Sequence, residues 1–100
     1  MADNNRAVNG NRAVNGKPSS PLGRAPRGFR GRIQAIQVGV GASDLPADEL
    51  ENRLIELGFV EGALVEILHE GPFGSDPIAV RVNNATIALR RREAMAILVT

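Results

Sequence analysis

The sequence lacks cysteine, tryptophan and tyrosine, and it has one histidine, His69, and three phenylalanines. Without cysteine the chain cannot form disulfides, thiolate zinc sites, iron–sulfur clusters or a cysteine nucleophile. A single histidine leaves no two-histidine metal pair. No apolar run approaches the ~20 residues that cross a bilayer, and the polar start, Met1–Asn5, is unlike a secretory signal. We therefore expect a cytoplasmic protein.

Charge is distributed unevenly along the 100 residues. Residues 1–32 include seven basic residues and one acid, whereas residues 33–100 include five arginines and ten acids. A basic head can bind nucleic acid, but it can equally be a solvated tail. The solvated tail is favoured, because the head has no dense Lys/Arg block and no interleaved aromatic residues.

The first residues carry a tandem hexapeptide, since Asn5–Gly10 is repeated as Asn11–Gly16. Two copies of six residues cannot stack into a solenoid, and the frequent Asn and Gly oppose regular structure. We predict a disordered tail over residues 1–19 and one domain over residues 20–100. Pro18 and Pro21 form a PxxP spacing, which is interpreted as a linker rather than a polyproline ligand.

The first half of the domain is expected to hold one strand and one helix. Residues 28–38 predict a strand whose alternation slips at Ile36, which indicates either a bulge or a strand with two buried faces. Ser43–Pro46 then predicts a helix start, with Ser or Asp as the cap. Leu50, Leu54 and Leu57, widened by Ile55, form an apolar stripe at helical spacing. Gly58 predicts the helix end.

After Gly58 the apolar period changes from 3.6 to 2. Strands are predicted at 64–69, 78–82, 86–89 and 95–99, with a hairpin turn at Asn83–Asn84 and one helical turn at 90–94. Five short strands favour a small curled β-barrel, because closure hides the strand edges.

The residues carry little catalytic chemistry. The serines lie in predicted linkers, caps or loops, and one histidine is available to activate them. A metal site from Glu66, His69 and Glu70 fails because alternation on a regular strand turns His69 away from the two acids. The Arg90–Arg92 run is the one sharp charge cluster. It could bind an acidic partner or a phosphate, or it could neutralise the acidic body of the domain and cap a turn. The residues thus indicate a small β-barrel binding module and not an enzyme.

Three blocks, in this order, resemble the family of ferrous iron transport protein A (FeoA), a small SH3-like domain. They are residues 54–67 (LIELGFVEGALVEI), Gly71–Gly74 with Pro77, and Ala88–Arg90 with Glu93, Ala94 and Ile97. The resemblance covers about residues 20–100. It implies structural positions at Leu54, Leu57, Gly58, Gly62, Pro72, Gly74, Pro77, Leu89, Glu93 and Ala94.

The resemblance also implies a function. It suggests a cytoplasmic, non-enzymatic accessory that binds the cytoplasmic part of the ferrous iron transporter FeoB, without a cofactor, a metal site or nucleic acid. Contact with the inner face of the membrane would be indirect, through the transporter. The candidate partner-binding residues are Phe73, Arg90, Arg91 and Arg92. Polyproline binding is disfavoured because Tyr and Trp are absent.

Two alternatives stay open. One is an SH3-like regulatory module of an iron-dependent transcriptional regulator, which would need a separate DNA-binding chain because no helix-turn-helix fits this sequence. The other is a small β-barrel that binds nucleic acid through its basic tail.

Overall fold

The computed structural model describes residues 18–39, 41 and 43–100. The disordered tail predicted for residues 1–19, with its repeat, lies outside the described residues as far as residue 17. Within them, six antiparallel strands form one sheet in the order β2-β7-β3-β4-β5-β6. The elements are β2 (Ser20–Pro21), the 3₁₀ turn η1 (Leu22–Arg24), β3 (Arg30–Ile36), α1 (Ala47–Glu56), β4 (Leu64–Glu70), β5 (Ile78–Val82), β6 (Ala85–Leu89), α2 (Arg91–Ala94) and β7 (Ile97–Val99).

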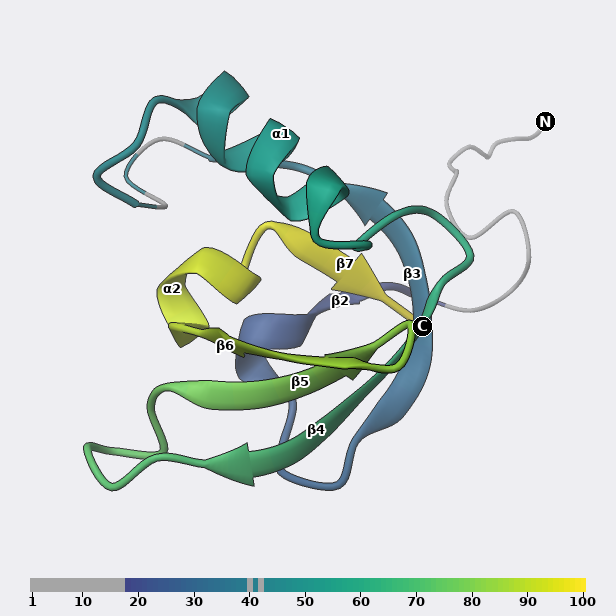
Figure 1. Cartoon of the computed structure of the whole chain (residues 1–100), viewed down its shortest axis with the longest axis vertical. Coiled ribbons are helices and arrows are strands. Elements are labelled where there is room, and N and C mark those ends of the chain that lie inside the picture. Colours follow the sequence, from purple (N-terminus) through teal and green to yellow (C-terminus); the bar gives the residue numbers. More distant parts are fainter. Residues whose placement is uncertain (1–17, 40, 42) are drawn as a thin grey trace, which may run out of the picture.

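The sheet curls around one hydrophobic core (Figure 1). Alternate side chains point inward, as at Ile78, Val80 and Val82, which are at most 1% exposed. The expected mainly β fold with two short helices is therefore present. Closure by hydrogen bonding is not, because in the described part of the chain β2 and β6 stand at opposite ends of the strand order and do not pair.

The β5–β6 hairpin forms where local sequence predicts it. Asn83 and Asn84 have φ angles of 49° and 66°, which asparagine tolerates better than most residues. Of the two alternatives for the first strand, a bulge is present, as a shift in the β3–β7 register between Ile33 and Ala35, slightly before the slip at Ile36 that indicated it. These features follow from residues that are neighbours in sequence.

Helix α1 covers the core with one face of its apolar stripe. Leu50 and Leu54 are buried and Leu57 is half-buried. Ile55 does not widen the buried stripe as predicted, because it is 43% exposed. Gly58, at φ 107°, ends the helix.

The predicted cap at the start of α1 is wrong. Pro46 occupies the N-cap position, which carries no side-chain cap. The Ser43 hydroxyl instead accepts a hydrogen bond from the Leu45 amide at 3.0 Å, so it stabilises a turn that precedes the helix.

Pro21, which the PxxP spacing assigned to a linker, lies instead in the short strand β2. Ser20 and Pro21 pair with Val99 and Leu98 of β7, and Leu22 is fully buried in the core. Local spacing does not predict this two-residue strand, because its partners come from the other end of the chain. Residues 20–25 are therefore part of the folded domain.

Candidate partner-binding site

The loop between β4 and β5 presents the most exposed large apolar side chain of the described residues. Phe73 is 82% exposed. The loop is closed at its base by the Gly71 amide, which donates to the Pro77 carbonyl at 2.7 Å. Gly74 takes a φ of 67°, a conformation that glycine adopts without a steric penalty. The turn residues thus form a compact loop with an aromatic ring in solvent.

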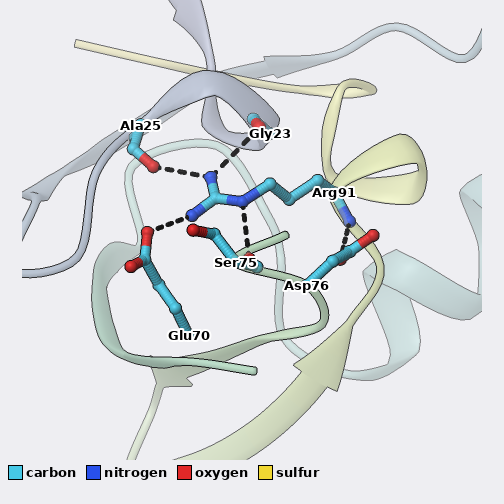
Figure 2. Close-up of polar contacts among 6 residues, drawn as sticks. All are labelled: Gly23, Ala25, Glu70, Ser75, Asp76 and Arg91. Atoms are coloured by element: carbon cyan, nitrogen blue, oxygen red, sulfur yellow. Dashed lines mark hydrogen bonds and ion pairs between the residues drawn. The ribbon is translucent and has the colours of Figure 1, made fainter. Parts of the chain in front are cut away.

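Arg91 holds the C-terminal part of this loop, at Ser75 and Asp76 (Figure 2). Its Nε donates to the Ser75 carbonyl at 2.8 Å, and its backbone amide donates to Asp76 Oδ1 at 2.8 Å. Its Nη2 forms an ion pair with Glu70 Oε2 at 2.6 Å. The side chains of Arg91 and Glu70 are only 20% and 30% exposed, so this pair is shielded more than a typical surface pair.

The same guanidinium also reaches the start of the domain. Nη1 donates to the Ala25 carbonyl at 2.7 Å and to the Gly23 carbonyl at 3.2 Å. Arg91 therefore ties three segments together: α2, the loop that carries Phe73, and η1 with the residue after it. An aromatic side chain on an anchored loop loses little conformational entropy when a partner buries it.

The three consecutive arginines have different environments in the structure. Arg91 is engaged by its own chain, so its geometry favours a structural role over the predicted partner contact. Arg90 and Arg92 are exposed. The Glu93 carboxylate accepts from the Arg90 amide at 3.0 Å and caps α2, and Arg92 lies 3.6 Å from an exposed Asp44. Arg90, Arg92 and Phe73 stay the predicted contact residues.

The remaining motif positions lie where they shape the fold. Leu89 and Ala94 are buried on either side of the Arg90–Glu93 cap. Gly62, at φ 87°, leads the chain into β4. Pro72 and Pro77 flank the tip of the Phe73 loop.

The acids and histidine of β4 do not gather into a metal cluster. A register shift between Ile67 and His69 breaks the regular alternation on which the sequence argument relied. Glu66 faces Arg30, whereas Glu70 pairs with Arg91. Over residues 18–39, 41 and 43–100, no group of three or more His, Asp or Glu side chains could hold a metal ion. None of the described helices is long and apolar enough to span a membrane.

Comparison with known proteins identifies the fold and the family. The model of the FeoA domain matches residues 20–100. The chain belongs to the FeoA family. FeoA proteins are associated with ferrous iron transport and form a non-enzymatic accessory family. No curated protein sequence matches the chain.

Solved FeoA structures support this assignment. FeoA from Stenotrophomonas maltophilia, a zinc complex described as a prokaryotic SH3 domain protein, is 31% identical, with a TM-score of 0.65 over 80% of this chain and 88% of that one. A FeoA-like protein from Clostridium acetobutylicum is 25% identical, with a TM-score of 0.68 over 84% of this chain and 87% of that one. The fold is thus SH3-like.

A regulator shares the fold. IdeR from T. acidophilum is 21% identical, with a TM-score of 0.66 over 92% of this chain and 36% of that one. At this identity the likeness concerns the fold alone. It does not extend the regulator alternative beyond a shared SH3-like domain.

Proposed function

We propose that this FeoA-family protein is a cytoplasmic accessory of ferrous iron uptake that binds the cytoplasmic part of a FeoB-type ferrous iron transporter. Family membership supports the link to iron transport. The S. maltophilia relative is described as a candidate bacterial ferrous iron transport activating factor.

The observation that carries the binding proposal is the anchored Phe73 loop. A ring that is 82% exposed on a fixed loop has much apolar surface to bury against a partner. Aromatic anchors of this kind often dominate interface energetics. Arg90 and Arg92, the exposed neighbours of Arg91 in the sequence, would add charged contacts at the rim.

Calorimetric titration of the full chain with the cytoplasmic domain of its own organism's FeoB-type transporter tests this proposal, with and without guanine nucleotide. We expect saturable binding, and a loss of about tenfold or more in affinity for Phe73→Ala. Val60→Ala is the matched control, because Val60 is a 41% exposed apolar residue away from the loop. It should bind like the unmodified chain.

The proposal fails if the unmodified chain does not bind in either nucleotide state. It also fails in its choice of surface if Val60→Ala weakens binding as much as Phe73→Ala. In cells, a deletion strain should lose ferrous iron uptake, and the gene encoding Phe73→Ala should restore it less well than the unmodified gene. Normal uptake in the deletion strain would count against the accessory role.

A further inference from the structure

The outer face of strands β3, β4 and β5 carries a basic hollow that is separate from the Phe73 loop. In the sheet register Arg30 lies opposite Glu66, and Glu66 lies opposite Arg81. Arg32 lies opposite Leu64 on the next outward-facing pair. Because directly opposed residues share one face of a sheet, these side chains point to the same side. They line a hollow of about 500 Å³.

Positive charge is in excess there. Glu66 is the one acid among the lining residues, against three arginines. Its contact with Arg30 is loose, with Nε and Oε1 3.9 Å apart and the Arg30 side chain 77% exposed. Among the described residues, Arg81 has no acidic partner within 4.0 Å. A concave site lined mainly by one sign of charge focuses the field on an oppositely charged ligand.

One of these arginines is also held in position. Arg32 Nη1 donates to the Gly62 carbonyl at 2.9 Å. This bond uses one of the five donors of the guanidinium, so the other donors can meet a ligand. A planar guanidinium matches a carboxylate with two parallel hydrogen bonds.

The hollow has an apolar component as well. Leu64, the first residue of β4, lines it and is 59% exposed. A ligand that offers only carboxylates would make no apolar contact with Leu64. A peptide that places an aliphatic side chain between carboxylates would satisfy both the arginines and Leu64.

We propose that this hollow binds an acidic peptide segment of a partner protein, with one aliphatic residue set against Leu64. Nucleic acid fits less well. The lining residues include no aromatic side chain for base stacking. The proposal requires neither the FeoB-type transporter nor Phe73.

The test is an NMR titration of the ¹⁵N-labelled full chain with the capped pentapeptide acetyl-EELEE-amide. We expect shift changes confined to β3, β4, β5 and the Asn83–Asn84 turn. The double variant Arg30→Gln and Arg81→Gln should weaken binding about tenfold. The double variant Arg24→Gln and Arg53→Gln is the matched control, because it also removes two positive charges, from exposed residues that do not line the hollow. It should bind like the unmodified chain.

Two further arms examine the chemistry of the peptide. The analogue acetyl-QQLQQ-amide should not bind, which would show that the carboxylates are required. Acetyl-EEAEE-amide should bind more weakly than acetyl-EELEE-amide, and this difference should disappear in Leu64→Ser. Because Leu64 is exposed, this variant also serves if the double arginine variant does not fold.

Several results would overturn the proposal. Equal weakening by the control double variant Arg24→Gln and Arg53→Gln would mean that the peptide responds only to net charge. Tighter binding of a twelve-nucleotide single-stranded DNA to the same residues at 150 mM salt would assign the hollow to nucleic acid. Shifts of these residues with protein concentration alone would assign it to a second copy of the chain. Phe73→Ala should bind the peptide normally, so this proposal and the transporter proposal can fail separately.

Discussion

At the scale of single residues, Arg91 holds the loop that carries Phe73 in place, although Arg91 itself is not part of that loop. Its four side-chain partners are Gly23, Ala25, Glu70 and Ser75. They lie 16 to 68 positions away along the chain. The sequence shows a run of three arginines, but no local signal distinguishes the inward one from its neighbours. This is why Arg90, Arg91 and Arg92 were predicted as one cluster.

We predict that Arg91→Ala lowers the free energy of unfolding by about 2–4 kcal/mol, because it leaves carbonyls and the Glu70 carboxylate without their donor. Arg91→Lys should recover part of this loss, since an ammonium keeps the charge but cannot reach acceptors spread around a planar fork. Urea denaturation measures both. The matched control is Arg92→Ala, whose side chain is 57% exposed and should change stability by less than about 0.5 kcal/mol. Equal stability of Arg91→Ala and Arg92→Ala would contradict the anchoring role.

At the scale of elements, the end of α1 is joined to the β5–β6 turn. The Phe59 amide donates to the Leu54 carbonyl and the Gly58 amide to the Ile55 carbonyl, both at 3.0 Å, which is the Schellman pattern. A Cβ on Gly58 would lie 2.6 Å from Asn83 Nδ2. The glycine therefore serves the helix end and also the close approach of the hairpin turn.

We expect Gly58→Ala to cost about 2 kcal/mol and Gly62→Ala about 1 kcal/mol in the free energy of unfolding. Both glycines have positive φ, but a Cβ on Gly62 would meet nothing within 4 Å. The difference between the two variants thus measures the contact with Asn83. Asn83→Gly should remove that difference when it is combined with Gly58→Ala, in a double-mutant cycle. A cycle with no coupling would show that the close approach costs nothing.

Sequence reasoning succeeded for elements whose signals are local. Strand β5, the Asn83–Asn84 turn, the single turn of α2 and the end of α1 at Gly58 each depend on spacing or backbone preference within a few residues. Sequence reasoning failed for features that depend on contacts between residues far apart in the sequence. Strand β2 forms because β7 pairs with it and the core buries Leu22, which follows it, and the basic hollow exists because three strands bring Arg30, Arg32 and Arg81 together. The alternation of Arg30 and Arg32 was the one available hint of that outer face.

At the scale of the whole molecule, the described surface offers two different binding features on one small core. The Phe73 loop presents an apolar anchor that Arg91 holds against η1, and the hollow on β3–β5 presents positive charge around Leu64. They are built from different residues, so each can be altered without removing the other. An accessory protein with two such surfaces could hold two segments of a partner at once, and the gain in affinity would then come from effective concentration.

The N-terminal boundary of the folded unit gives the last prediction. A chain that lacks residues 1–19 should keep its free energy of unfolding within about 0.5 kcal/mol, since β2 begins at Ser20 and the family match begins at residue 20. A chain that lacks residues 1–25 should lose at least about 3 kcal/mol, because Leu22 is fully buried and the carbonyls of Gly23 and Ala25 accept hydrogen bonds from Arg91. Thermal and urea unfolding of both truncations measure this. Destabilisation by the shorter deletion would move the boundary upstream, whereas a stable longer deletion would show that the opening segment is dispensable for the fold and that the Phe73 loop does not need its anchor there.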